Sequence, residues 1–358
     1  MTTILSHHTG VEYMRRLRIA SLQRPTYMSD WLEDPLRGLH RIERGAIDLA
    51  GGNAEGPPRP RIQFLSGQEC NEVLRNATVP ARVELEELKA RIPFISGADS
   101  CCHLLVGNPD GRRRRPSVKS SVLRAELWPG SLWRIADDVY VCSPELLFVQ
   151  MADILPRPVL VRLGLELCGG YCICPQEAGG IKSAYAVTTP ERLAKSIDAA
   201  GRVPGVKEAR IAGRRIRCNA ASPAEVNLFM LLCFPRQEGG YGLPCPELNG
   251  EICIALPDGT IRKRFCDFLW DNLAVEYIGD DSHAGIDATL EDANRQGELA
   301  MAGIRVVPVT KSHVNNIAKM DGIVASIAED LGVKKRRKLG AFCERQLELH
   351  STLYPWAH

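Results

Sequence analysis

Two acidic residues lie inside apolar strings that are predicted to form neighbouring β-strands. Asp267 lies in the string Cys-Asp-Phe-Leu-Trp and Glu276 in the string Ala-Val-Glu-Tyr. A lone carboxylate inside an apolar strand is costly to bury unless it is paired or bound to a metal ion. Two carboxylates that meet on adjacent antiparallel strands supply the hard oxygen ligands that Mg²⁺ or Mn²⁺ prefers. Such an ion activates a water molecule and neutralises the charge that builds on a phosphodiester.

Taken alone, the two acids are equally consistent with solvated carboxylates on an exposed sheet edge, and the order of the surrounding elements favours the metal site. Ser222-Pro223 followed by Glu225 is the capping-box start of a helix, which ends before Pro235. Three strands, an amphipathic helix and a buried strand are predicted next, at 252–256, 262–270, 273–278, 289–302 and 304–309. This order predicts an α/β fold with a mixed central sheet flanked by helices.

The last third of the chain resembles the very-short-patch-repair-like endonuclease domains of actinobacterial proteins, which belong to the PD-(D/E)xK nuclease superfamily. The resemblance rests on weak strings that share their order and spacing, and it implies a restriction-endonuclease-like αβββαβ core. The strings are Ser222-Pro223-x-Glu225, Gly239-Gly240-Tyr241-Gly242-Leu243-Pro244 with Leu248-Asn249, Asp267-Phe268-Leu269-Trp270, Ala274-Val275-Glu276-Tyr277, His283, Asp292-x-x-Arg295 and Gly303-Ile304-Arg305-Val306-Val307.

The resemblance also implies roles by position. Asp267 and Glu276 would bind the metal ion, Mg²⁺ or Mn²⁺, and Glu225 would be an accessory acid near the ion as well as part of the capping box. His283, in the loop after the third strand, would contact a phosphate or shuttle a proton, although a lone loop histidine is as often inert. Arg295 would reach a DNA phosphate.

Two features of this segment leave alternatives open. Asp292 and Arg295 lie three apart on one helix face, so a surface ion pair is the simpler expectation for them. In the relatives, the position two after the Glu is usually Asp or Lys, and here it is Ile278. Asp280 and Asp281 follow closely, and Lys311 is a more distant cation that could compensate.

Because of Ile278, the site is either rewired or inactive, and three functions stay open. The first is a metal-dependent endonuclease that hydrolyses DNA phosphodiester bonds in phage defence, restriction or repair. The second is a catalytically degenerate nuclease fold that acts as a DNA-binding regulator of the antitoxin kind. The third is a protein-interaction partner without a nucleic-acid role.

The sequence predicts five segments. Residues 1–60 read as a weakly structured tail or linker, 61–183 as an α+β domain, 184–221 as a connector, 222–332 as the nuclease-like domain and 333–358 as a basic tail. The strings at 103–106, 139–145 and 167–171 resemble the region that precedes the nuclease domain in the same relatives. That region is distantly similar to the AbiEi antitoxin group, which implies a regulatory or DNA-binding role.

DNA contact would need a local basic surface, because the net charge is only +2. Arg112–Arg115 is one basic run. Such runs neutralise phosphates, but they are also typical of solvated surfaces. The second run, which we expect to contact DNA, consists of Lys334, Lys335, Arg336, Arg337 and Lys338.

The composition points to a cytoplasmic protein. We find no run of eighteen apolar residues and no apolar leader with a small-residue cleavage site, so we expect neither a membrane span nor secretion. The 13 cysteines are odd in number and lie in apolar strings, which is typical of reduced core thiols. Cys168, Cys172 and Cys174 form the one cluster that invites a metal interpretation, and small core residues are the favoured alternative. A homodimer remains open.

Overall fold

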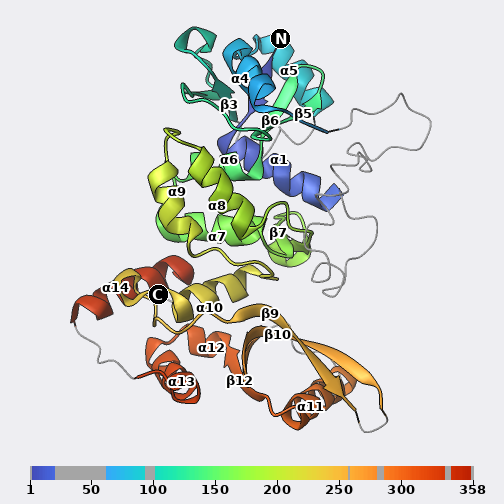
Figure 1. Ribbon diagram of the computed structural model, residues 1–358, viewed down its shortest axis with the longest axis vertical. Coiled ribbons are helices and arrows are strands. Elements are labelled where there is room, and N and C mark those ends of the chain that lie inside the picture. The colour runs from blue at the N-terminus through green and yellow to red at the C-terminus, as the bar shows by residue number, and fades with distance from the viewer. Residues whose placement is uncertain are drawn as a thin grey trace. The chain divides into compact units, whose positions relative to one another are not determined.

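The computed structural model describes residues 2–20, 62–92, 101–256, 259–279, 286–334 and 340–355. The chain divides into two compact units, Met1–Cys218 and Asn219–His358, and both mix helices with strands (Figure 1). Within the described ranges, no helix is both long and apolar enough to cross a membrane. None of the thirteen cysteines, all of which lie in the described ranges, forms a disulfide bond, and Cys168, Cys172 and Cys174 are buried.

The first unit is built on a six-stranded mixed sheet in the order β2-β5-β6-β1-β3-β4. β1 runs parallel to β6 and antiparallel to β3, so it has neighbours on both sides. The strands are β1 (Thr3–Leu5), β2 (Gln63–Phe64), β3 (Cys102–Val106), β4 (Val118–Val122), β5 (Leu132–Ala136) and β6 (Val139–Cys142).

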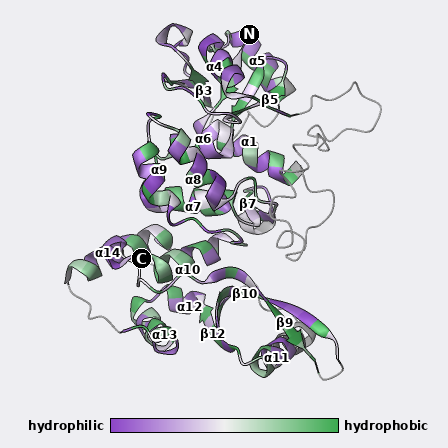
Figure 2. Cartoon of the chain, viewed as in Figure 1, coloured by the Kyte–Doolittle hydropathy of each residue, from purple (hydrophilic) through white to green (hydrophobic). Residues whose placement is uncertain are grey.

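Helices and a small β-hairpin complete the first unit. Ser66 and Ser143 cap α4 and α6 through their side-chain oxygens. Hydrophilic and hydrophobic residues are mixed along α8 and α9, which is typical of helices with one exposed face (Figure 2). The elements are α1 (His7–Ala20), α4 (Gly67–Asn76), α5 (Arg82–Arg91), α6 (Pro144–Met151), α7 (Arg157–Leu167), β7 (Tyr171–Ile173), β8 (Ile181–Ser183), α8 (Pro190–Ala199) and α9 (Val206–Gly213).

The N-terminal segment differs from the tail predicted for residues 1–60. Ile4, Leu5 and Met14 have no exposed surface, and α1 contacts α6, β3 and β7. The guanidinium of Arg18 is buried and donates to three backbone carbonyl oxygens, those of Glu166, Gly169 and Tyr185. Residues 2–20 are therefore part of the core of the first unit, whereas residues 21–61 lie outside the described ranges.

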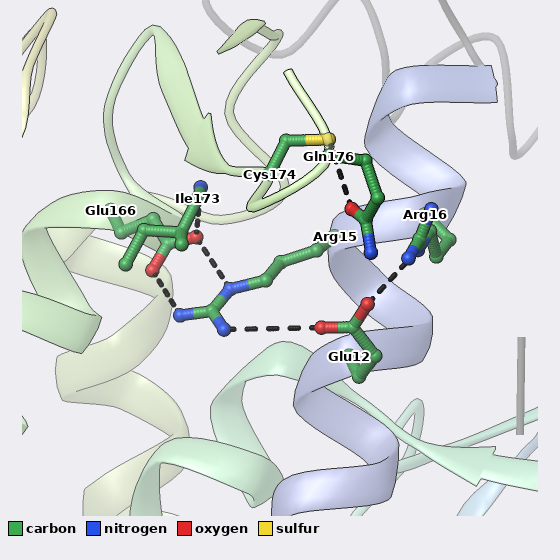
Figure 3. Close-up of polar contacts among 7 residues, drawn as sticks. All are labelled: Glu12, Arg15, Arg16, Glu166, Ile173, Cys174 and Gln176. Carbon is green, nitrogen blue, oxygen red and sulfur yellow. Dashed lines mark hydrogen bonds and ion pairs between the residues drawn. The ribbon is translucent and has the colours of Figure 1, made fainter. Parts of the chain in front are cut away.

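Charged residues also attach α1 to α7 (Figure 3). Arg15 Nε and Nη2 each lie 2.8 Å from one carboxylate oxygen of Glu166, and the backbone N–H of Ile173 donates to the same carboxylate at 3.0 Å. The Glu166 side chain is 2 % exposed. The predicted connector at 184–221 is also part of this unit through its two helices, because α8 contacts α6, α9 contacts α7, and Leu193 and Ile197 are buried.

The second unit carries a four-stranded sheet in the order β12-β11-β10-β9. β9, β10 and β11 are antiparallel neighbours, and β12 is parallel to β11, so the sheet is mixed as predicted. The chain order is helix, three strands, helix, strand: α10 (Pro223–Cys233), β9 (Glu247–Ala255), β10 (Ile261–Trp270), β11 (Leu273–Ile278), α11 (Ile286–Met301) and β12 (Arg305–Thr310).

Packing in this unit places α11 along the sheet, as Figure 1 also shows. Leu299 of α11 is buried with Ile254, Cys266 and Ala274 of the three antiparallel strands. The short α12 (Lys311–Val314), α13 (Ile317–Asp330) and α14 (Gly340–Leu353) follow β12. α10 contacts both β11 and α14.

The C-terminal segment differs from the basic tail predicted for 333–358. Phe342, Leu349 and Leu353 of α14 are buried, and the Asn227 side chain of α10 donates to the backbone carbonyl of Leu353 at 2.8 Å. The spacing of these apolar residues is that of one helix face. Of the basic run, only Lys334 lies inside the described ranges.

Candidate functional site

Asp267 lies where the pairing of β10 with β11 ends. The last cross-strand pair is Phe268 with Val275. One residue further, Asp267 Oδ2 accepts the backbone N–H of Tyr277 at 2.7 Å. The carboxylate thus takes the place of a backbone acceptor, which fixes its position against β11. Continuing the register by one residue places Asp267 opposite Glu276.

Glu276 is joined to α11 by an ion pair. Its Oε1 lies 2.7 Å from Nη2 of Arg295, which also donates to the backbone carbonyl of Phe265 at 2.6 Å. The Glu276 side chain is 14 % exposed. Arg295 is therefore engaged inside the site, in contrast to the surface pair with Asp292 that its spacing suggested; the side chain of Asp292 lies outside the described part of the chain.

Glu225 joins the acids from the first turn of α10. Its carboxylate accepts from the backbone N–H of Ala221 at 3.0 Å, the Ser222 hydroxyl at 2.9 Å and Asn249 Nδ2 at 3.0 Å. Ser222 Oγ caps the helix by accepting the N–H of Glu225. The helix start is confirmed, but the carboxylate bonds Ala221 rather than the backbone of Ser222, and this aims it toward β9.

The three acids share one electrostatic environment. Burial, and then the negative charges of Glu225 and Glu276, raise the pKa of Asp267 well above its usual value. Burial also raises the pKa of Glu225, with a further contribution from Glu276, although its hydrogen bonds oppose the rise. Burial raises the pKa of Glu276 as well, because the opposing charge of Arg295 does not outweigh it. The carboxylates are thus close enough to disfavour one another's ionisation.

Cys266 adds a polarisable group to this environment. It has no exposed surface, and burial followed by the charge of Glu276 raises the pKa of its thiol to about 12. The thiol is therefore neutral at physiological pH and acts as a hydrogen-bonding partner of Glu276 rather than as a nucleophile.

The donor chemistry fits a hard divalent cation, but the ligand set is not closed. Three carboxylates and the buried, unpartnered amide oxygen of Asn249 are the kinds of oxygen that Mg²⁺ and Mn²⁺ bind. Among the described residues, no group of three or more His, Cys, Asp or Glu side chains is arranged to hold a metal ion. In the structure, Glu276 is neutralised by Arg295 instead. Ile278 is 37 % exposed and offers no donor side chain.

Of the other predicted site residues, Lys311 and Lys334 lie inside the described ranges. Lys311 directly follows Thr310, the residue of β12 that pairs with Ile278 of β11, so its backbone lies one strand away from the apolar third position. Lys334 is exposed at the end of a described segment. His283 and the run Lys335, Arg336, Arg337 and Lys338 lie outside the described residues.

Asn249 and the inward role of Arg295 were not predicted. Asn249 is followed by Gly250, and an Asn-Gly pair is a signal for left-handed backbone, which Asn249 adopts with φ 49°. That signal could have marked the position. The spacing along α11 could not show that Arg295 reaches Glu276, because the contact depends on how α11 lies on the sheet.

A cavity elsewhere in this unit is separate from the acids. It has a volume of about 860 Å³ and is lined by the loop after α10, including Tyr241 and Leu243, and by α13, including Val324. None of the three acids lines it.

Comparison with known proteins leaves the unit without an assigned family: no family model matches the chain, and neither the curated proteins nor the solved structures contain a significant match.

Proposed function

We propose that the C-terminal unit is a PD-(D/E)xK-type endonuclease domain that binds Mg²⁺ or Mn²⁺ and hydrolyses DNA phosphodiester bonds in the cytoplasm, in phage defence, restriction or repair. The observation that carries the proposal is the convergence of Glu225, Asp267 and Glu276 from α10, β10 and β11. Burial raises the pKa of all three carboxyls, and the charge of Glu276 raises the pKa values of Asp267 and Glu225 further. Carboxylates crowded in this way gain most from a bound divalent cation.

The arrangement of elements supports the same proposal. The helix, three antiparallel strands, helix and parallel strand follow the αβββαβ order that the resemblance implies. Asp267 and Glu276 occupy adjacent strands of this sheet, and Glu225 lies on the first helix. This is the placement expected from the strings around Asp267, Glu276 and Glu225.

In the proposed reaction, Asp267, Glu276 and Glu225 would hold the ion, which when bound would activate water and neutralise charge on the phosphate. The N–H of Tyr277 orients Asp267 at 2.7 Å. Arg295, whose side chain is 32 % exposed, would turn a nitrogen toward a phosphate oxygen. Lys311 would supply positive charge beside the position that Ile278 leaves apolar.

The first test is DNA cleavage. Asp267→Asn and Glu276→Gln each preserve shape and remove a charge, so we expect each to abolish Mg²⁺- or Mn²⁺-dependent nicking of supercoiled plasmid. Asp271→Asn is the matched control, because Asp271 lies exposed in the turn between the same two strands and should nick as the unsubstituted protein does. Equal nicking by all three variants would rule out this centre as the active site.

A second function, a degenerate nuclease fold that binds DNA as a regulator, is favoured by one specific observation. The third motif position carries Ile278, and Glu276 is already neutralised by Arg295 at 2.7 Å. A site in this state has its one arginine paired with an acid and no donor side chain at position 278, which favours a fold that binds DNA elsewhere on its surface without cutting it.

If the protein is a DNA-binding regulator, its affinity for DNA should weaken as the salt concentration rises, because phosphate contacts release counterions. Replacing Lys334, Lys335, Arg336, Arg337 and Lys338 by Ala should lower affinity on every sequence and reduce the slope of log affinity against log salt by about one for each phosphate that the run neutralises. The control replaces each Lys of the run by Arg and each Arg by Lys, which keeps the charge. Fluorescence anisotropy of a labelled duplex measures both quantities, and a fall in affinity without a change in slope would argue against phosphate binding by this run.

A further inference from the structure

Asn249 leaves the regular pairing of the sheet beside Asp267. β9 and β10 pair on both sides of this position, and the Asn249–Asp267 pair between them is missing. Asn249 adopts a left-handed backbone with φ 49°, a conformation that asparagine tolerates better than most residues. The chain therefore uses a strand position, next to an acid of the site, to turn one amide side chain away from the ladder.

The hydrogen bonds of this amide are unbalanced. Asn249 is 2 % exposed, and its Nδ2 donates to the backbone carbonyl of Asn219 at 2.7 Å and to Glu225 Oε2 at 3.0 Å. Because both partners are acceptors, the amide cannot be exchanged end for end, and its Oδ1 is fixed on the other side. Within the described residues, Oδ1 is buried and accepts no hydrogen bond.

A second acceptor in the same place is also unpartnered. The side-chain oxygen of Asn219 is buried without a donor among the described residues, and Asn219 too has a left-handed backbone, with φ 69°. Two unpartnered amide oxygens thus belong to Asn249, which bonds the buried carboxylate of Glu225, and to Asn219, which bonds Asn249. An unmatched buried acceptor costs about 1–3 kcal/mol, so this local excess of oxygen atoms calls for a positively charged or donating group.

A buried amide oxygen without a partner also occurs away from the acids, at Asn227. Asn227 is equally buried at 2 %, its Nδ2 also bonds a backbone carbonyl, and its Oδ1 is also unpartnered. Its amide bonds the carbonyl of Leu353 in α14, whereas the amide of Asn249 bonds a carboxylate of the acidic site. The difference is the position beside the acids.

We propose that Asn249 Oδ1 is a further oxygen ligand of the divalent cation that Asp267, Glu276 and Glu225 would hold in the proposed function, and that it supplies the donor that Ile278 does not offer. This inference rests on the proposed function. An amide oxygen is a hard ligand that adds no negative charge to three acids that already repel one another. Through Nδ2, the same side chain also positions Glu225, so one residue would serve two parts of the site.

The test measures binding of Mn²⁺ alone to the full-length protein by isothermal titration calorimetry, without DNA. Asn249→Gly keeps the left-handed backbone and removes the amide, and we expect its Mn²⁺ affinity to fall at least about tenfold, the range seen when groups around a metal site are removed. Asn249→Asp keeps an oxygen ligand and removes the donor to Glu225, and it should bind Mn²⁺ at least as tightly as the unsubstituted chain. Asn227→Ala is the matched control and should change the affinity less than about twofold.

Three other outcomes would each contradict either the inference or the proposed function. If Asn249→Asp weakens binding as much as Asn249→Gly, the residue acts only through its bond to Glu225, and its role as a ligand is wrong. If both Asn249 variants bind as the unsubstituted chain does while Asp267→Asn does not bind, the inference fails and the cation site stands. If the unsubstituted chain binds no Mn²⁺, the proposed function fails and the inference fails with it.

Discussion

At the scale of single residues, the folded chain disfavours the ionised form of the Asp267 carboxyl. Burial, Glu225 and Glu276 raise its folded-state pKa well above the usual aspartate value. A carboxyl whose pKa rises on folding stabilises the folded state below its unfolded pKa, and this contribution is lost as pH rises through the folded pKa. Without a bound cation, ionisation of Asp267 should therefore make the second unit less stable at neutral pH than in mild acid.

Replacing the charge should relieve this cost. We expect Asp267→Asn, with a chelator present, to raise the free energy of unfolding of the second unit at pH 7, by about 1.4 kcal/mol for each pKa unit of the rise. Near pH 4 the gain should be smaller, because the carboxyl is protonated there. Asn retains an oxygen to accept the N–H of Tyr277. Hydrogen exchange in β10 and β11 at both pH values measures the effect.

Asp271→Asn is the control for this measurement, since Asp271 lies exposed in the adjoining turn and its substitution should stay within about 0.5 kcal/mol at either pH. A loss of stability on Asp267→Asn that is the same at both pH values would show that the carboxylate is not under electrostatic stress.

At the scale of elements, β11 presents its potential ligands on alternate residues. Side chains two apart in a strand point to the same side, so Ile278 lies on the side of Glu276. Its partner on β12 is Thr310. The alternation therefore places the side chain of residue 278 on the same side of the sheet as Glu276, where the present isoleucine offers no oxygen atom.

We expect Ile278→Asp to supply the missing oxygen donor. Because the side chain is 37 % exposed, a carboxylate there should be tolerated in the fold. Mn²⁺ affinity should rise by about tenfold, on the scale of changes around metal sites, and plasmid nicking should rise with it. Ile278→Val is the control, since it changes shape without adding a donor. Equal Mn²⁺ affinity of the two variants would show that this position does not face the ion.

At the scale of the whole molecule, the first unit depends on a charge pair that joins its N-terminal helix to α7 (Figure 3). Burial alone would raise the pKa of Glu166, but the charge and hydrogen bonds of Arg15 outweigh it and hold the pKa below its usual value. A depressed carboxyl pKa contributes stability above the unfolded value and loses it as pH falls through the folded value. Acidification below about pH 4.5, the usual value for glutamate, should therefore destabilise this unit through Glu166.

Glu166→Gln should destabilise the first unit at pH 7 by about 3 kcal/mol, the low end for breaking a buried pair, because the Arg15 side chain keeps 22 % exposure. The difference from the unsubstituted chain should shrink toward pH 3. Glu177→Gln removes the exposed pair with Lys182 and should cost less than about 1 kcal/mol. Hydrogen exchange of α1 and α7 distinguishes this unit from the other, and equal effects of the two substitutions would contradict the assignment.

The elements that the sequence predicted well have strong local signals. Ser222-Pro223 marks the start of α10, and the apolar residues on both sides of Glu276 mark β11. β1 was missed because three residues, Thr3–Leu5, are too few to show a period, and its place inside the sheet depends on β3 and β6. The apolar residues of α14 recur with a helical period, but the adjacent basic run led to the prediction of a tail.

The sequence by itself determined the mixed helix and strand content, the order of elements around the acids and the position of Asp267 and Glu276 in neighbouring strands, because these depend on local spacing. The tertiary structure decided which groups the acids meet. Arg295 reaches Glu276 from α11, and Asn249 turns out of β9 toward Glu225. Such contacts depend on helix placement and backbone handedness across distant segments, and no local pattern encodes them.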